Sequence, residues 1–314
     1  MNDYITRKIK SKKKGIYNYE YFDKKNNKVN KKSINKYLTG IYIPPAYDDV
    51  KINKNKTSKV LAIGLDDKGR SQYTYNKKTI KKNSKSKYKK LIDFGENYET
   101  IMKKINKDFN GPDSKNKQIS LILKLIIDCN FRVGNEKYTI DNKSYGVSTL
   151  EKKHLKFTKN KLIIDFIGKK GVNNVCNVSN KKLITILNKQ YNNKSSKKIF
   201  FYTTEDNQIK NIKSSDVNSY LKNLGNYTTK NFRTWNANIG LIKNIIKSNH
   251  KENILSECIK EVAEDLHHTP SVCKKNYIDP KLIDFFEKSN KGFHAFFSNG
   301  NVNKKYTNFL NSKY

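Results

Sequence analysis

The hydrophobic pattern of this chain changes its period near residue 80, and that change divides the chain into two parts. Before it, apolar and aromatic residues alternate in short runs separated by turn-forming residues, as in antiparallel strands. Strands are expected at residues 16–22, 50–52, 60–65 and 72–75, with turns at 24–27 and 66–69. Residues 1–80 are therefore predicted to form a β-rich domain. Residues 1–14 at its start are basic and are expected to be loose.

The run of lysine, asparagine and serine at residues 77–90 contains the predicted linker, residues 81–90. After it, apolar residues recur at helical spacing. Helices are expected at 98–109, 119–131, 181–190, 215–224, 237–247, 254–266 and 271–286. Residues 162–167 and 172–178 are predicted to form a hairpin around the turn Gly168-Lys169-Lys170-Gly171. The predicted class is α+β, with a small N-terminal antiparallel β domain and a larger, mostly helical domain, residues 91–314, that holds a small sheet.

The net charge of +37 indicates an anionic partner. Nucleic acid is the first candidate, because each phosphate that a basic residue neutralises releases condensed counterions. The abundance of lysine and asparagine also fits the coding bias of an AT-rich genome, so the charge supports this interpretation without deciding it. A role at a membrane surface would need a basic amphipathic helix, and the sequence shows no clear one.

The cysteines, Cys129, Cys176, Cys258 and Cys273, have no paired CxxC spacing. Neither structural zinc nor a disulfide framework is expected from this pattern. The sequence shows no signal peptide and no apolar run long enough to span a membrane. An intracellular, reducing compartment is therefore expected.

The segment His-His-Thr-Pro-Ser-Val-Cys-Lys-Lys-Asn-Tyr, residues 267–277, places a tyrosine among lysines. Thr269 suits a helix N-cap and Pro270 suits the first helical position, so Tyr277 is expected about two turns inside a helix. By itself this pattern fits a core tyrosine as well as a nucleophile. A tyrosine has an ordinary pKa of about 10. To attack a phosphodiester it needs cations around the phosphate and the phenolate.

Arginine suits the phosphate, because its guanidinium binds two oxygens at once. Only four of the 65 basic residues are arginines, namely Arg7, Arg70, Arg132 and Arg233. Where lysine would serve, this chain uses lysine, so the arginines are candidates for positions that need a planar donor. Arg132 follows an apolar helix and Arg233 lies in Phe232-Arg233-Thr234-Trp235. Either could instead cap a helix, and Arg132 could pair with Glu136.

Cleavage of a DNA phosphodiester also requires a proton donor for the leaving sugar oxygen. Lys169, on the hairpin turn, is a candidate, although a solvated turn lysine fits the local sequence as well. His268 could donate a hydrogen bond to a non-bridging phosphate oxygen or could be a satisfied histidine without a catalytic role. The adjacent His267 leaves the choice between the two histidines open.

Taken together and in order, these segments resemble the small type IB DNA topoisomerases of poxviruses, giant viruses and bacteria. Residues 43–50 resemble the N-terminal signature of that family, with Tyr47 where tryptophan is more usual. Residues 64–75 resemble its DNA-contacting hairpin. The other matches, in family order, are residues 131–135, 144–150, 168–169, 232–235 and 268–277. The resemblance covers nearly the whole chain.

The resemblance implies a tyrosine recombinase-like catalytic domain with the catalytic residues Arg132, Lys169, Arg233, His268 and Tyr277. It implies that the tyrosine forms a 3′-phosphotyrosyl bond with one strand of double-stranded DNA and frees a 5′ hydroxyl. The arginines and the histidine would hold the phosphate, and the lysine, with one arginine, would protonate the leaving oxygen. After the cut strand has swivelled, the 5′ hydroxyl attacks back.

No cofactor is expected from this resemblance, because the covalent link stores the phosphodiester energy without ATP or a metal ion. In agreement, the sequence shows no P-loop and no carboxylate cluster suited to two metals. The family also implies a monomer that clamps the duplex. The expected location is a bacterial cytoplasm, or a viral factory or virion if the source is viral.

In the first domain, five residues fall where the family touches DNA: Lys68, Arg70, Gln72, Tyr73 and Tyr75. Glutamine can pair with the edge of adenine, and arginine with guanine or phosphate. Strand alternation puts the two tyrosines on one face and Gln72 on the other. One of the tyrosines could therefore belong to the core.

A tyrosine recombinase or integrase is the closest alternative, because it shares the expected fold and nucleophile. Recombinases typically carry a histidine three residues before the second arginine. This chain has Lys230 there, which is the topoisomerase pattern and adds Lys230 to the expected DNA contacts. A non-enzymatic DNA-packaging protein would account for the charge but not for the ordered motifs.

Overall fold

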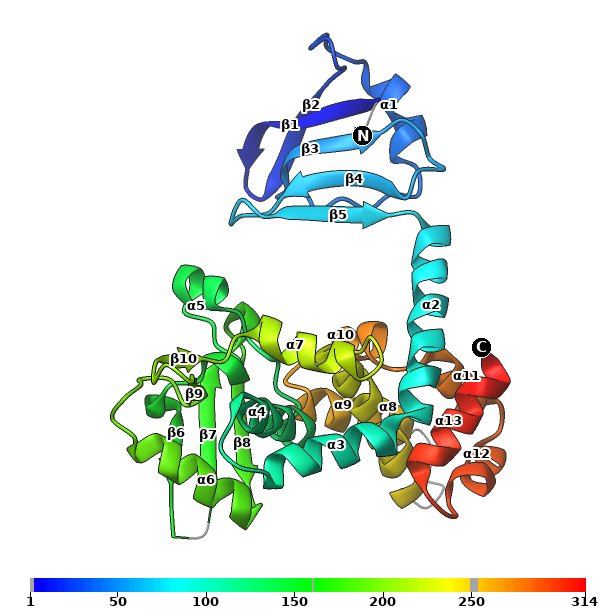
Figure 1. Ribbon diagram of the computed structural model, residues 1–314. Coiled ribbons are helices and arrows are strands. Elements are labelled where there is room, and N and C mark those ends of the chain that lie inside the picture. The colour runs from blue at the N-terminus through cyan, green and yellow to red at the C-terminus, as the bar shows by residue number, and fades with distance from the viewer. Residues whose placement is uncertain (1–2, 160, 249–253) are drawn as a thin grey trace. The chain divides into compact units, whose positions relative to one another are not determined.

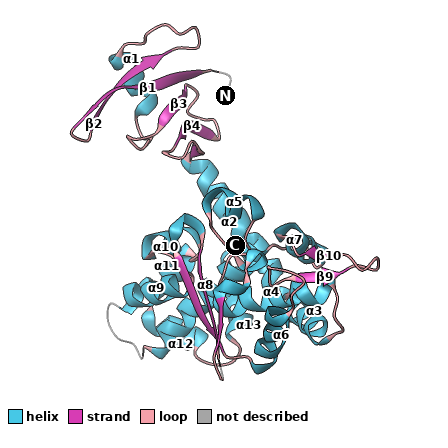
Figure 2. Cartoon of the chain, turned by 90° about the vertical axis from the view of Figure 1, so that its left-hand side faces the viewer, coloured by secondary structure: helices cyan, strands magenta, loops and turns pink. Residues whose placement is uncertain are grey.

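The computed structural model describes residues 3–159, 161–248 and 254–314. The chain divides into two compact units, Met1–Lys87 and Tyr88–Tyr314. This division falls inside the segment predicted as the linker. The first unit is built mostly from strands and the second mostly from helices (Figures 1 and 2). The predicted α+β class is therefore confirmed.

The first unit holds one antiparallel sheet in the order β2-β1-β3-β4-β5 (Figure 1). Its strands are β1 (Tyr4–Lys13), β2 (Ile16–Phe22), β3 (Asp48–Asn53), β4 (Val60–Leu65) and β5 (Ser71–Tyr75). A short helix, α1 (Lys31–Leu38), was not predicted. Its Ile34 is fully buried and shares a core with Ile5, Val50 and Ile52 of the sheet. The sheet thus buries one apolar face under α1.

The basic N-terminal segment is ordered as β1, so the expectation of a loose start is wrong for residues 4–13, while residues 1–2 lie outside the described residues. β1 pairs with both β2 and β3. Successive side chains of β1 alternate between the two faces of the sheet, and Ile5 and Arg7 share the buried face, where they are 1% and 5% exposed. Arg7 Nη2 donates to the carbonyls of Pro44 and Tyr47, at 3.0 and 2.8 Å. The lysines that follow obscured this alternation in the sequence.

The predicted linker is helical, because α2 (Lys77–Glu96) runs through all of it. Lysine is a good helix former, so a lysine-rich segment can form a helix where no turn residue interrupts it. The buried residues of α2 are Tyr88, Leu91 and Phe94, at helical spacing and all in its second half. The first half of α2 belongs to the first unit and the second half to the second unit.

Within its described residues, the second unit contains two small sheets among its helices, one of order β6-β7-β8 and one of order β10-β9. The strands are β6 (Leu155–Phe157), β7 (Leu162–Ile167), β8 (Asn173–Val178), β9 (Phe201–Thr203) and β10 (Ile209–Asn211). The helices are α3 (Tyr98–Asn110), α4 (Lys115–Cys129), α5 (Glu136–Asn142), α6 (Lys181–Asn192), α7 (Ser214–Asn223), α8 (Thr229–Lys247), α9 (Ile254–Asp265), α10 (Pro270–Asn276), α11 (Pro280–Lys288), α12 (Asn290–Phe297) and α13 (Val302–Lys313).

The core of the second unit forms around α4 and α8, which pack against each other. α8 buries Phe232 and Trp235, whose rings lie 5.0 and 5.7 Å from that of Phe94 on α2. α8 begins eight residues earlier than predicted, at Thr229, so it includes the motif Phe232-Arg233-Thr234-Trp235. A buried helix therefore positions the second arginine of the candidate site.

The single helix predicted at residues 271–286 is wrong, because the structure breaks it into α10 and α11. Tyr277 is the C-cap of α10 and does not lie in a helix interior. Pro280 is the first residue of α11, and a proline disfavours helical geometry in the residue before it. Asp279, the preceding residue, is extended at φ −75° and ψ 117° and caps α11 through a hydrogen bond from Lys281 N.

Candidate active site

Four of the five proposed catalytic residues lie together in the second unit. Arg132 follows α4, Arg233 lies in α8, His268 lies between α9 and α10, and Tyr277 ends α10. His268 Nε2 is 2.5 Å from Arg132 Nη2 and 3.3 Å from Tyr277 Oη. The guanidinium carbon of Arg233 is 5.4 Å from the centroid of the Tyr277 ring. Two arginines and a histidine thus surround one tyrosine hydroxyl.

The backbone around Arg132 is held by a close approach of two glycines. The carbonyls of Arg132 and Val133 accept hydrogen bonds from Val147 N and Ser148 N, at 2.9 and 2.7 Å. A Cβ on Gly146 would lie 2.4 Å from the backbone nitrogen of Gly134, so only glycine fits there. The glycines in residues 131–135 and 144–150 therefore have a physical reason: they let the two segments pair and orient Arg132.

The backbone around Tyr277 is held by buried side chains from two helices. Asn238 of α8 is fully buried, and its Nδ2 donates to the carbonyl of Tyr277 at 3.0 Å. Its Oδ1 accepts from Asp279 N at 2.8 Å. Tyr88 of α2 donates from its hydroxyl to the carbonyl of Ile278 at 2.7 Å. Three successive residues after α10 are thus anchored, which fixes the direction of the Tyr277 side chain.

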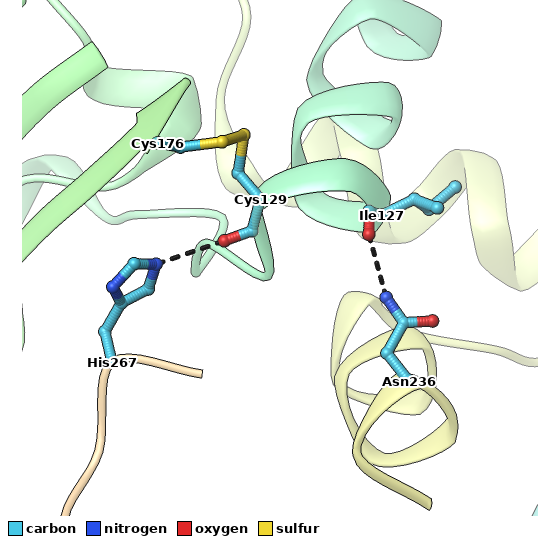
Figure 3. The surroundings of a disulfide bond; sticks show 5 residues. All are labelled: Ile127, Cys129, Cys176, Asn236 and His267. Atoms are coloured by element: carbon cyan, nitrogen blue, oxygen red, sulfur yellow. Dashed lines mark hydrogen bonds between the residues drawn. A yellow bond between two sulfur atoms is a disulfide. The ribbon is translucent and has the colours of Figure 1, made fainter. Parts of the chain in front are cut away.

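His267 holds the segment of His268 against the end of α4. Its backbone is left-handed, at φ +55°, which is uncommon for a residue other than glycine. Its Nε2 lies 3.1 Å from the carbonyl oxygen of Cys129, as Figure 3 shows, and its ring stacks on Phe131 at 5.2 Å. Of the two adjacent histidines, His268 therefore faces the tyrosine and His267 faces the helix that precedes Arg132.

The pKa of Tyr277 is lower than its ordinary value. Burial raises it, but the positive charges of Arg233, Arg132 and Lys230 together outweigh burial. The pKa of His268 falls to about 4, through burial first and then through the charges of Arg132 and Arg233. At neutral pH His268 is therefore uncharged, and the phenolate of Tyr277 is easier to form than in an ordinary tyrosine.

Arg233 has unused donors beside the tyrosine. It is 3% exposed, and its Nη2 donates to the carbonyl of Leu266 at 3.0 Å. Its Nε and Nη1 are buried and make no hydrogen bond within the described part of the chain. Buried donors are usually paired, so these two nitrogens call for an acceptor from outside the protein. A phosphate oxygen has the required charge and geometry.

The fifth proposed catalytic residue, Lys169, is an exposed residue at the tip between β7 and β8, in a short turn over Lys169–Gly171. Its positive charge contributes to the lowered pKa of His268. Lys230 is exposed in the first turn of α8, and its charge helps to lower the pKa of Tyr277. Both lysines therefore lie within electrostatic range of the four clustered residues.

The proposed DNA contacts of the first unit lie on and around the turn between β4 and β5. Tyr73 and Tyr75 are 51% and 44% exposed and stack on each other at 6.1 Å, so the suggestion that one of them belongs to the core is wrong. Arg70 forms an ion pair with Asp66, which also accepts from Gln72 Nε2 at 2.9 Å. Lys68 is exposed in this turn, and its backbone N–H donates to Asp66 Oδ1.

Cys129 and Cys176 form a disulfide, although the cysteine spacing predicted no disulfide framework, so that prediction is wrong for this pair. They are 47 residues apart in the sequence, at the end of α4 and in β8, and no spacing rule connects them. Cys258 and Cys273 are free and buried. In the parts of the chain that are described, no group of three or more metal-binding side chains could hold a metal ion. None of the described helices is long and apolar enough to cross a membrane.

Sequence reasoning missed Asn238 and Tyr88, because asparagine and tyrosine are common in this chain and only their contacts distinguish these two. It also missed α5, which follows Arg132 and exposes Tyr138 and Ile140 by 54% and 81%.

Comparison with known proteins shows two family matches. The family described as eukaryotic DNA topoisomerase I, catalytic core, matches residues 76–296, and the bacterial DNA topoisomerase IB N-terminal domain matches residues 18–66. DNA topoisomerase 1B of Acanthamoeba polyphaga mimivirus is 33% identical over 88% of this chain and 86% of its own length. DNA topoisomerase I of Monkeypox virus is 25% identical over 81% of this chain and 82% of its own. DNA topoisomerase 1 beta of Arabidopsis thaliana is 29% identical over 61% of this chain and 21% of its own.

Proposed function

The chain belongs to the type IB DNA topoisomerase family, and from this premise we propose that Tyr277 is its nucleophile. The observation that carries the proposal is the arrangement around the tyrosine hydroxyl. His268 Nε2 lies 3.3 Å away, and Arg233 beside it has two buried donors without an acceptor in the described protein. The recombinase alternative is not favoured, since the matched families and relatives are topoisomerases.

In the proposed reaction, Tyr277 Oη forms a bond to phosphorus while the bond from phosphorus to the 5′ oxygen breaks. The tyrosine then carries the 3′ phosphate, and the cut strand ends in a 5′ hydroxyl. Swivelling of that strand relaxes supercoils, and attack of the 5′ hydroxyl on phosphorus restores the strand and frees Tyr277. The number of phosphodiester-type bonds is conserved in each step, so we propose that neither ATP nor a metal ion takes part.

The electrostatics support a division of roles. Arg132 and Arg233 bind the non-bridging oxygens, whose negative charge they neutralise in a site with little water. His268 is neutral at physiological pH, and its Nε2 accepts from Arg132 in the structure without DNA. Once Arg132 binds the phosphate, the neutral imidazole can change tautomer and donate a hydrogen bond from Nε2 to a phosphate oxygen. Lys169 provides the proton for the leaving 5′ oxygen, which would otherwise depart as a strongly basic alkoxide.

Double-stranded DNA is the substrate of this family, and the contacts of the first unit with it are part of the proposal. The exposed pair Tyr73 and Tyr75 offers flat faces for sugars and thymine methyl groups, with Lys68 and Arg70 beside it for phosphates. Gln72 provides an edge for adenine, and Lys230 contacts the backbone near the nucleophile. A monomer whose two units grip the duplex and an intracellular location also belong to the proposal. The disulfide removes the ground on which a reducing compartment was expected.

Relaxation of supercoiled plasmid in EDTA without ATP tests the reaction. Wild-type protein should relax the plasmid and should leave a covalent protein–DNA adduct when denatured during the reaction. Tyr277→Phe should remove the adduct and the relaxation while DNA binding persists. Tyr227→Phe is the matched control, because Tyr227 is also buried in the second unit, but its hydroxyl bonds the carbonyl of Asp93. An adduct on folded Tyr277→Phe would show that another tyrosine is the nucleophile.

A further inference from the structure

We propose that the disulfide between Cys129 and Cys176 is a positioning bond for Lys169, so that DNA cleavage by this protein depends on thiol redox state. The inference rests on the proposed function, in which Lys169 protonates the leaving oxygen. The disulfide joins the helix that leads to the phosphate-binding arginine with the hairpin that carries the lysine. It is the covalent link between two parts of one catalytic site.

On one side of the bond, Cys129 is held by the catalytic segments. It is the last residue of α4, three residues before Arg132, and its carbonyl lies 3.1 Å from His267 Nε2. Asn236 of α8 donates from Nδ2 to the carbonyl of Ile127 and to Asn130 Oδ1, both at 2.9 Å. Figure 3 shows the contacts of His267 with Cys129 and of Asn236 with Ile127 at the end of α4. The Cys129 sulfur is thus a fixed point relative to the arginines and histidines.

On the other side, Cys176 lies in β8 and pairs with Ile164 of β7. The two strands end in the turn that carries Lys169, where Gly168 N donates to the carbonyl of Val172 at 2.8 Å. A Cβ on Gly168 would lie 2.4 Å from Asn174 Nδ2, so the base of the turn is closely packed. A displacement of β8 is therefore transmitted to the turn and to Lys169.

The tip of the hairpin has little other support. Ile167, Val172 and Val175 are 47%, 38% and 45% exposed, and Lys169 is itself exposed. The hairpin keeps a hydrogen bond from Tyr145 N to the carbonyl of Ile167, at 2.9 Å, and buries Phe166. Loss of the disulfide should therefore leave the hairpin folded while widening the range of positions that the Lys169 ammonium samples.

The bond is open to reduction from the hairpin side, because Cys176 is partly exposed while Cys129 is 5% exposed. A dithiol is the reductant required. One of its thiolates attacks a disulfide sulfur and displaces the other cysteine as a thiolate, and its second thiol then closes a cyclic disulfide and releases the first cysteine. Two cysteine thiols and one oxidised dithiol result, and the two thiolates take up protons from water.

Single-turnover cleavage of a duplex oligonucleotide by oxidised and by dithiothreitol-reduced protein tests the proposal. Alkylation in denaturant followed by mass measurement should find two free thiols before reduction and four after it. On ordinary DNA, the cleavage rate should fall by about tenfold or more, since a positioned acid contributes roughly 10²–10⁴-fold. Cys176→Ser should cleave at the slow rate with or without dithiol.

A second substrate, with sulfur in place of the bridging 5′ oxygen at the cleavage site, separates the role of Lys169 from a general loss of structure. A thiolate leaves without protonation, so its cleavage should change by less than about threefold on reduction. Lys169→Ala should cleave ordinary DNA slowly in both redox states, with no further loss on reduction. Asn303→Ala, which removes a remote hydrogen bond to Trp235, should keep the wild-type response to dithiol.

Several outcomes would overturn the proposal. The first is four free thiols in protein that was never reduced, and the second is an equal cleavage rate of ordinary DNA by oxidised and reduced protein. The third is an equal loss of cleavage rate on both substrates, which would mean that reduction disturbs the phosphate site as a whole. If oxidised wild-type protein forms no adduct with either substrate, the proposed function fails instead, and that result is distinct from all of these.

Discussion

Replacing Asn238 with alanine should displace the proposed nucleophile, Tyr277, without removing any side chain that is proposed to contact DNA. Asn238 is fully buried and makes two hydrogen bonds to the backbone that follows α10. Its Nδ2 donates to the carbonyl of Tyr277 and its Oδ1 accepts from Asp279 N. Because α10 ends at Tyr277, no helical hydrogen bond replaces these contacts. The variant therefore leaves a buried carbonyl and a buried N–H without partners.

The size of the effect follows from these two groups. An unpaired buried polar group costs about 1–3 kcal/mol, so the loss of two partners should lower the free energy of unfolding by roughly 2–6 kcal/mol. The effect on cleavage has a different origin. If the Tyr277 backbone relaxes outward by about 1 Å, the hydroxyl leaves the line of attack on phosphorus, and a displacement of that size costs on the order of 100-fold in rate.

Single-turnover cleavage at low temperature, with urea unfolding on the same preparations, measures both effects. Asn303→Ala is the matched control, because it removes the acceptor of the 2.7 Å hydrogen bond from Trp235 Nε1 of the same helix, and within the described part of the chain its side chain makes no hydrogen bond with Tyr277 or the backbone after it. The control should lose about 1–3 kcal/mol of stability and keep its cleavage rate within about threefold. If folded Asn238→Ala cleaves as fast as the control, these contacts do not position Tyr277.

Three further predictions concern charge and pH. Arg132→Ala removes a charge that lowers the pKa of Tyr277, so the pH at which the cleavage rate rises should move to more alkaline values. An unchanged pH profile would contradict the influence of Arg132 on the Tyr277 hydroxyl. The pKa of His268, about 4, lies below its ordinary value of 6.5, so as the pH falls the unfolded chain binds this proton before the folded protein does. The free energy of unfolding in urea should therefore fall as the pH drops from about 6.5 towards 4. His268→Asn should show a smaller fall, and an equal fall would contradict the assignment. Lys68→Ala should reduce the slope of log DNA affinity against log salt concentration by about 0.9. The control Lys28→Ala removes a lysine that is paired with Glu20, and it should leave this slope unchanged. Equal slopes for the two variants would show that Lys68 does not contact a phosphate.

Much of the fold was predictable from local patterns. β4 spans the residues expected from alternation, 60–65, and β7 spans the expected 162–167. The patterns failed where lysine obscured them. In β1, the basic composition makes the alternating burial of Ile5 and Arg7 hard to recognise. The lysine-rich sequence of α2 resembles a linker although it forms a helix. Both depend on burial of a few residues against elements distant in the sequence.

The candidate site was only partly predictable. The scarcity of arginine singled out Arg132 and Arg233, which meet at the tyrosine, but it also singled out Arg7, whose hydrogen bonds to backbone carbonyls are structural. The break after Tyr277 was present in the sequence as Pro280, and it places Tyr277 at the end of α10 with its hydroxyl beside His268.

The sequence by itself determined the family, the α+β class, the order of the motifs and the residue types of the candidate site, because these depend on neighbours along the chain and on the identity of a few side chains. The tertiary structure alone decided that α4 and β8 are joined through Cys129 and Cys176, and that Asn238 holds the backbone of Tyr277. Such contacts join residues tens of positions apart. Packing of buried helices and strands brings them within bonding distance, and nothing in their local sequence records that distance.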